Sequence, residues 1–216
     1  MVPEQQTPRR RGRPPKQRAD LMETRELLLR AGLEVFTEKG FSATGIEEIL
    51  GRVGVPKGSF YHYFDSKEDY GLEVIGRYGV FFARKLDRHL LDPARPPLAR
   101  LRAFVIDAAE GMARHEFRRG CLIGNLGQEM GALPESFRVR LRDTFEDWQA
   151  RFAACLNEAQ RAGWLAPQAD CAGLAAVFWI GWEGAVLRAK LERSARPLEL
   201  LYSQINFQLA DSRCIG

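Results

Sequence analysis

Hydrophobic residues recur every three or four positions along most of the chain, which is the spacing of one face of an α-helix. In the first such stretch, residues 23–40, Leu29, Leu33 and Phe36 follow this spacing, and Gly40 stands where a helix commonly ends. The sequence has no convincing run of strand-like alternation and no internal repeat. The chain is therefore predicted to be all-α.

Two short helical stretches follow, separated by a glycine. In residues 44–54, Thr44 and Glu47 have the spacing of a capping box, which predicts Thr44 as the N-cap of the first. Gly54 permits a tight turn, and Pro56 suits the first position of the second stretch.

Longer helices are predicted for the rest of the chain. Ser66 suits the N-cap of a helix that runs to about Leu91, where a proline-rich segment, 93–97, interrupts the pattern. Two strong helical stretches come later, at about 135–163 and about 170–192. The helix at about 170–192 is apolar nearly all round, so several of its faces must be buried against other parts of the protein. We expect a second subunit to bury one of them.

A longer helix followed by two short helices and a glycine turn has the layout of a helix-turn-helix, whose second short helix enters the major groove. Lys57 can meet a phosphate there, and Gly58 lets the backbone approach closely. The polar-tipped side chains of this stretch are Ser59, Tyr61, His62 and Tyr63. Phe60 and Phe64, one turn apart, are expected to anchor it to the core. Lys67 begins the next helix, where free N–H groups also attract phosphate.

The net charge of +4 is concentrated in an N-terminal arm. Residues 8–18 contain six basic residues and no acid, so the rest of the chain carries a formal charge of about −2. Residues 1–20 contain almost no large apolar side chains and are predicted to be disordered. Arg11 and Arg13 lie in the tetrapeptide RGRP, which resembles the core of an AT-hook that enters a narrow A·T minor groove. The alternative is a solvated tail that adds only nonspecific attraction to phosphate.

The sequence contains no motif of an enzyme, a cofactor-binding protein or a membrane protein. There is no phosphate loop, no metal-ligand set and no nucleophile–base pair, so we predict neither an enzyme nor a cofactor or metal site. No transmembrane or secretory segment is evident. The cysteines are widely spaced, which is typical of free thiols in a reducing cytoplasm; they are Cys121, Cys155, Cys171 and Cys214. The basic arm leaves open a different class, an architectural protein that binds A·T-rich DNA.

Residues 44–70, TGIEEILGRVGVPKGSFYHYFDSKEDY, closely resemble the DNA-binding signature of TetR-family transcriptional regulators. The resemblance implies a homodimer that binds a palindromic operator, with an N-terminal three-helix helix-turn-helix domain over residues 21–70. It also implies a larger all-helical domain over 71–212 that binds a ligand and dimerises through the helices at 135–163 and 170–192. By position, the residues that touch DNA are Thr44, Lys57, Ser59, Tyr61, Tyr63 and Lys67, with His62 as a further candidate.

Polar groups suited to a ligand pocket concentrate in two segments, residues 114–130 and 179–190. The candidates are Arg118, Cys121, Asn125, Glu129, Trp182, Glu183 and Lys190. Glu183 lies within an apolar stretch, so it must be paired or hydrogen-bonded if it is buried.

These two segments also resemble a branch of the TetR family that responds to small electrophilic or unsaturated molecules. The resemblance implies that Cys121 is a sensing cysteine and that Lys190 can engage it after oxidation. Neighbouring cations lower the pKa of a thiol, and Arg118, Arg119 and Lys190 are candidates for that role, whereas Glu183 would oppose it. Two hypotheses stay open: Cys121 reacts covalently with the inducer, or it only lines the site of a reversible ligand.

Overall fold

The computed structural model describes residues 18–211. This range contains nine helices and no strand, so the prediction of an all-α protein is confirmed. The elements are α1 (Arg18–Lys39), α2 (Ile46–Val53), the 3₁₀-helix η1 (Lys57–His62), α3 (Lys67–Leu90), α4 (Pro97–Arg114), α5 (Leu122–Gly127), α6 (Glu135–Arg161), α7 (Cys171–Glu192) and α8 (Arg196–Asp211).

The predicted minor-groove arm, with Arg11 and Arg13, lies outside the described residues, as does Cys214. The last three residues assigned to that arm, 18–20, are helical instead and form the first turn of α1.

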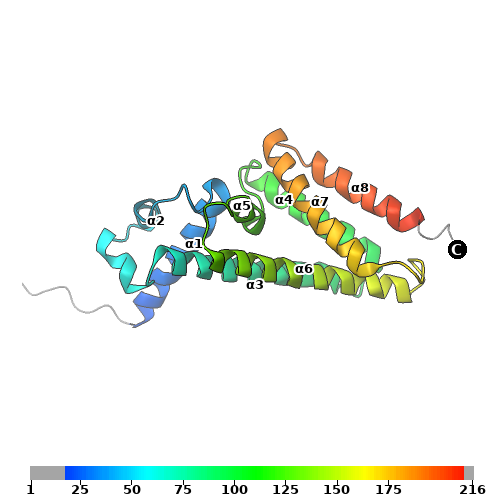
Figure 1. Ribbon diagram of the computed structural model, residues 1–216, viewed down its shortest axis with the longest axis horizontal. Helices are drawn as coiled ribbons and strands as arrows, with labels where there is room; N and C mark the ends of the chain where they lie inside the picture. The colour runs from blue at the N-terminus through cyan, green and yellow to red at the C-terminus, as the bar shows by residue number, and fades with distance from the viewer. Residues whose placement is uncertain (1–17, 212–216) are drawn as a thin grey trace, which may run out of the picture.

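The helices form two groups joined by α3 (Figure 1). α1, α2 and η1 gather at the N-terminal end, where α1 packs against α2 and α3. At the other end α3 and α6 run side by side, α4 and α7 cover them, and α8 packs on the outside of α4 and α7. The short helix α5 packs against α1, α3 and α6. It therefore connects the two groups.

Glycine and serine end and begin the helices as expected. Gly40 ends α1 with φ 88°, and its N–H donates to the Phe36 carbonyl at 3.1 Å. Gly54 turns the chain between α2 and η1 with φ 65°. The Ser66 hydroxyl oxygen accepts from the N–H of Asp69 at 2.9 Å and caps α3.

The prediction that Thr44 caps α2 is wrong. Gly45 occupies the N-cap position, and no side chain caps this helix. The Thr44 hydroxyl instead donates to the Gly40 carbonyl at 2.6 Å, and the residue is only 1% exposed. Because the hydroxyl closes the turn between α1 and α2, it is not available to the N–H groups of α2.

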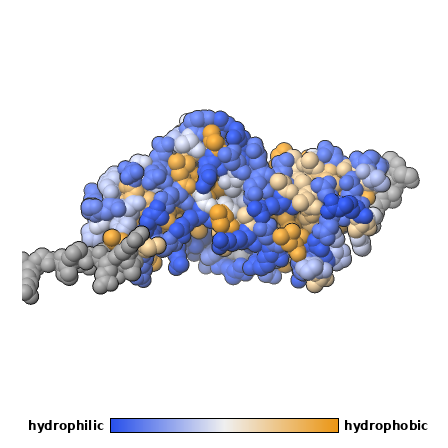
Figure 2. Space-filling view, turned by 90° about the horizontal axis from the view of Figure 1, so that it is seen from below, coloured by the Kyte–Doolittle hydropathy of each residue, from blue (hydrophilic) through white to orange (hydrophobic). Residues whose placement is uncertain are grey.

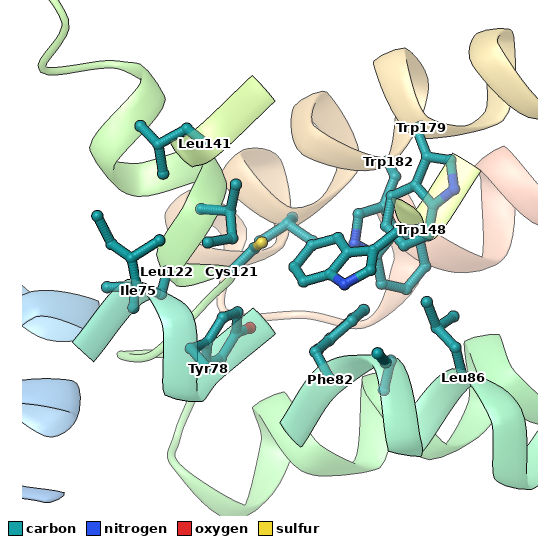
Figure 3. Close-up of a cluster of buried hydrophobic side chains, with 14 of the residues drawn as sticks. Ile75, Tyr78, Phe82, Leu86, Cys121, Leu122, Leu141, Trp148, Trp179 and Trp182 are labelled. Carbon is teal, nitrogen blue, oxygen red and sulfur yellow. The ribbon is translucent and has the colours of Figure 1, made fainter. Parts of the chain in front are cut away.

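The centre of the C-terminal half is an aromatic cluster from four helices (Figure 3). Phe82 of α3 packs on Trp148 of α6, with ring centroids 4.3 Å apart. Trp182 of α7 lies 5.0 Å from Phe104 of α4, and Trp179 lies 5.4 Å from Trp148. Such ring pairs stabilise beyond their buried area. The cluster fixes α7 against three neighbouring helices.

The exposed face of α7 is apolar. Val177, Ile180, Leu187 and Leu191 recur at helical spacing and are exposed, and Ile180 is 76% exposed. On α8, Leu200 is exposed as well. Hydrophobic residues gather toward the C-terminal end of the face shown in Figure 2, whereas hydrophilic residues cover most of the rest. Among the described helices, α7 alone has the length and hydropathy that a membrane span would need, and buried helices of bundles meet the same test.

The outer face of α6, which we expected at the dimer interface, is charged. Its exposed side chains form ion pairs with one another, such as Arg138 with Glu135 and Arg142 with Asp143. The exposed apolar surface of α7 therefore continues onto α8, whereas the outer face of α6 is charged.

Candidate DNA-binding face and ligand cavity

Two phenylalanines anchor the recognition element, as predicted. Phe60 and Phe64 are buried, and both rings pack edge-on against Tyr70 of α3, at 5.4 and 4.7 Å. The Tyr70 hydroxyl in turn donates to the Leu28 carbonyl of α1 at 2.5 Å. Burial raises the pKa of Tyr70, so this donor stays protonated. The aromatic anchor thus ties η1 to both longer helices of the N-terminal group.

Most residues on the outer side of η1 are exposed to solvent. Lys57, Gly58 and His62 are exposed, and Tyr61 is 66% exposed. Ser59 and Tyr63 are half-buried. Lys57 forms an ion pair with Glu47 of α2, which raises the pKa of its ammonium group. Because both side chains are exposed, a DNA phosphate can replace Glu47 at little cost.

Two residues matched to DNA contacts by family resemblance have other roles in this conformation. Thr44 is buried in the turn after α1. Lys67 is half-buried, and its Nζ donates to the Phe41 carbonyl at 2.8 Å while lying 4.2 Å from the Phe41 ring centroid. Burial lowers the pKa of Lys67, and the charge of Glu129 opposes that shift. Both residues therefore stabilise the turn that orients α2 and η1.

A cavity of about 380 Å³ lies between the two groups of helices. Leu33 and Thr37 of α1 form part of its wall, so the DNA-binding half contributes directly to it. The apolar wall is completed by Tyr78, Phe82, Met112, Trp182 and Val186. Basic side chains stand around it, from Arg30, Lys85, Arg114 and Arg119. An apolar interior with a basic rim suits a small, partly apolar molecule that carries a carbonyl or carboxylate group.

Cys121 also lines this cavity, and it is 4% exposed. Its sulfur lies between Tyr78 and the tryptophans of the aromatic cluster (Figure 3). Burial raises the pKa of the thiol well above its usual value, and the charge of Glu183 raises it further. The N–H groups of Ile123 and Gly124 lower it by less.

The cations that were expected to activate Cys121 point elsewhere. Arg118 pairs with Glu116, and Arg119 donates to Glu38 at 2.9 Å. Lys190 donates to the Asn125 side chain at 3.4 Å. The expectation of a thiol made acidic by these three side chains is therefore wrong for this conformation.

Glu183 interacts with Cys121, but it does not line the cavity itself. Its Oε2 lies so close to Gly124 that a Cβ there would come within 1.5 Å of it, so any other residue at this position would displace the carboxylate. Its Oε1 is buried and has no hydrogen-bond partner among the described residues. Burial raises the pKa of the carboxyl to about 7, and interaction with the Cys121 thiol opposes this shift. A buried carboxyl with such a pKa can take up or release a proton near neutral pH.

Asn125 and Glu129, expected in the ligand pocket, bind the DNA-binding half instead. The Asn125 side-chain amide donates to the Thr37 carbonyl of α1 at 2.7 Å. The Glu129 carboxylate accepts from the N–H groups of Phe41 and Ser42, at 3.0 and 2.8 Å. We call these three hydrogen bonds of Asn125 and Glu129 the α5 latch. Nothing in the local sequence marks it, because each bond joins residues 87 or 88 positions apart.

The described part of the chain has no candidate metal-binding site. No group of three or more His, Cys, Asp or Glu side chains is placed to hold an ion. Cys121, Cys155 and Cys171 are free and buried.

The chain is similar to known bacterial regulators over most of its length. Residues 28–70 match the family described as bacterial regulatory proteins, tetR family, and residues 97–205 match the tetracyclin repressor-like C-terminal domain. The transcriptional regulator AcuR of Cereibacter sphaeroides is 57% identical over 88% of this chain and 86% of its own.

Solved structures of related regulators have the same fold as this chain. A regulatory protein TetR from Rhodobacter sphaeroides superimposes with a TM-score of 0.81 at 56% identity, covering 83% of this chain and 95% of the other. The reduced form of NemR from E. coli gives a TM-score of 0.78 at 30% identity, covering 85% and 95%.

Proposed function

The chain belongs to the TetR family of transcriptional regulators, which are DNA-binding proteins and not enzymes, and we propose that it is a repressor controlled at Cys121. A homodimer binds a palindromic operator, with one η1 in each half-site. A small electrophilic or unsaturated molecule, or an oxidant, enters the cavity and is captured by the Cys121 thiol. The protein then leaves the operator. It acts in the cytoplasm, where its free thiols stay reduced.

One observation carries this proposal: the cavity beside Cys121 is built partly from α1, and α5 begins directly after Cys121. Leu33 and Thr37 belong to α1, so an occupant of the cavity contacts the DNA-binding half. Asn125 and Glu129, further along the same segment, hold the end of α1 and the following turn. A ligand releases DNA only if it binds the released arrangement more tightly than the DNA-bound one. A change at Cys121 is suited to that, because it displaces the start of α5 and with it the α5 latch.

The dimer that this function requires is expected to form through α7 and α8. Ile180 and Leu191 of α7 and Leu200 of α8 give an exposed apolar surface on the side away from the cavity wall. Gly184 lies between Ile180 and Leu191 on α7, and a Cβ added to it would meet no atom of the described residues within 4 Å. A partner helix can therefore approach closely there.

The test is a release assay with the operator that the protein selects from random DNA. We expect N-ethylmaleimide or acrylate to release the wild-type protein and to leave Cys121→Ser bound, with a mass increase on the wild type that peptide mapping places on Cys121. Cys155→Ser, which changes a buried thiol at another site, is the matched control and should respond like the wild type. Release of Cys121→Ser at the wild-type concentration would refute covalent capture.

A reversible ligand is the second candidate, and the rim of the cavity favours it. Among the described residues, Arg30 and Arg114 line the cavity and form no ion pair. Either guanidinium can bind the carboxylate of an unsaturated acid while the apolar wall holds its hydrocarbon part. In that case acrylate releases Cys121→Ser normally, leaves no mass adduct on the wild type, and loses its effect when Arg30 and Arg114 are both replaced by alanine.

A further inference from the structure

The buried pair Cys121 and Glu183 contains a feature that DNA release alone does not explain. A carboxylate that is buried without a full set of hydrogen bonds is costly, and replacing it by an apolar side chain would remove the cost. Glu183 nevertheless lies in the middle of α7, with Oε1 unpartnered among the described residues and Oε2 pressed against Gly124. The group it faces is the one thiol of the described chain that lines the cavity.

We propose that Glu183 is the proton acceptor that allows the Cys121 thiol to add to an α,β-unsaturated carbonyl compound in the cavity. This inference rests on the proposed covalent capture and assigns the residue that makes it possible. The arrangement suits the role, because Cys121 lines the cavity that the electrophile enters, and the buried Glu183 carboxyl, beside Gly124 of the same segment, interacts with the thiol.

The step balances with water as the only further participant. Glu183 accepts the thiol proton as the sulfur forms a bond to the β-carbon of the unsaturated compound. The electron pair of the double bond moves toward the carbonyl and forms an enolate. The enolate then takes a proton at its α-carbon from water in the cavity, and the hydroxide formed is neutralised by the proton that Glu183 releases. Nothing is oxidised or reduced, and no group leaves.

A proton acceptor is needed here because the thiol does not ionise by itself near neutral pH. Burial and the neighbouring carboxylate both raise the pKa of Cys121. Thiolate is the reactive form, so a positioned base gives its largest advantage when the thiol is otherwise fully protonated. Glu183 has a pKa of about 7, which leaves a substantial fraction ionised at neutral pH.

The other groups around the pair do not take this role. Tyr78 of α3 faces Cys121, but burial raises the pKa of its hydroxyl, so it stays protonated. Lys190, two turns further along α7, directs its ammonium group to Asn125 of α5. No cation of the described residues contributes to the pKa shift of Glu183, which is set by burial and by Cys121.

The rate of Cys121 alkylation in Glu183→Gln gives a decisive test, because two roles for Glu183 predict opposite signs. If Glu183 acts only as a neighbouring charge, its removal lowers the thiol pKa and alkylation becomes faster. If Glu183 accepts the proton, alkylation becomes slower, by about 10²-fold at pH 7.5, which is the usual scale of general base catalysis. The rate of modification by N-ethylmaleimide, followed on the Cys121 peptide after digestion, measures this directly. An unchanged or faster rate overturns the proposal.

The pH profile provides a second readout. The wild-type rate should rise through about pH 7 as Glu183 ionises, whereas the Glu183→Gln rate should rise only in the alkaline range where the thiol itself ionises. A wild-type profile without the rise near pH 7 counts against the proposal. Glu192→Gln is the matched control, since Glu192 is exposed on the same helix and pairs with Arg188, and it should leave the rate unchanged.

Gly124→Ala tests the same idea without removing the charge. A Cβ at this position displaces the Glu183 carboxylate, so alkylation should slow while the carboxylate remains in the protein. The result stays separable from the proposed function. If the wild-type protein forms no adduct at Cys121, covalent capture and the role of Glu183 both fail. An adduct that releases DNA but forms as fast in Glu183→Gln sinks only the role of Glu183.

Discussion

The carboxylate of Glu129 closes over Gly40, and a Cβ on that glycine would lie only 2.1 Å from Oε1. The same carboxylate accepts the N–H groups of the next two residues, Phe41 and Ser42. Gly40 also has φ 88°, a conformation that other residues rarely adopt. The end of α1 therefore accommodates the side chain of Glu129 closely. The α5 latch is thus a specific contact between the N-terminal group of helices and the segment that follows Cys121.

Replacement of this carboxylate should weaken the whole protein. We expect Glu129→Ala to lower the free energy of unfolding by about 1–3 kcal/mol, because two N–H groups lose a charged acceptor. Urea unfolding at constant protomer concentration measures the change. Glu135→Ala is the control, since Glu135 is exposed on α6 and pairs only with a neighbour on its own helix, and its effect should stay within about 0.5 kcal/mol. Equal effects of the two variants would contradict a structural role for the latch.

Buried Glu183 should make stability depend on pH. Its folded pKa of about 7 lies above the unfolded value of 4.5, so the folded state binds this proton more tightly than the unfolded state. Its contribution to stability is therefore complete below about pH 4.5 and is lost as the pH rises toward about 7. We expect Glu183→Gln to be more stable than the wild type by about 2–3 kcal/mol at pH 8 and similar to it at pH 5. Urea unfolding at several pH values checks this, and a constant difference would show that Glu183 does not titrate there.

Several helices and helix ends followed from local sequence, because capping and periodicity act over a few residues. Gly40, Gly54 and Ser66 each occupy the predicted position. The helix α8 was missed, although Leu198, Leu201 and Ile205 have helical spacing and pack inward. That signal was present and could have been found.

The contacts of individual polar residues were harder to predict from the sequence, because their partners are distant in the chain. Thr44 satisfied the capping-box pattern, yet its hydroxyl binds the turn before it. Asn125 and Glu129 stand close to Cys121 in the chain, and only the fold shows that they face α1 rather than the cavity. Glu183 was recognised as a residue that requires a partner, but its partner, Cys121, lies on another segment.

The dimer interface should be sensitive to charge on α7. Ile180 is 76% exposed in the centre of the apolar stripe. A glutamate there would be buried without a partner in a dimer, so Ile180→Glu should convert the protein to monomers and abolish tight operator binding. Val139→Glu, on the charged outer face of α6, is the control for the interface first predicted. Sedimentation equilibrium distinguishes the two, and a monomeric Val139→Glu would return the interface to α6.

Lys57 should contribute to DNA affinity through its charge alone. It is exposed, and its pairing with Glu47 adds little to stability, so Lys57→Ala should unfold at the wild-type urea concentration. Each phosphate contact releases counterions, so loss of one lysine should reduce the dependence of log K on log salt by about 1 per subunit. Arg142→Ala removes one positive charge from the outer face of α6 and should leave the salt dependence unchanged. Binding measured across a salt series therefore separates a phosphate contact from a general effect of net charge, and an unaltered slope for Lys57→Ala would place the lysine away from the DNA.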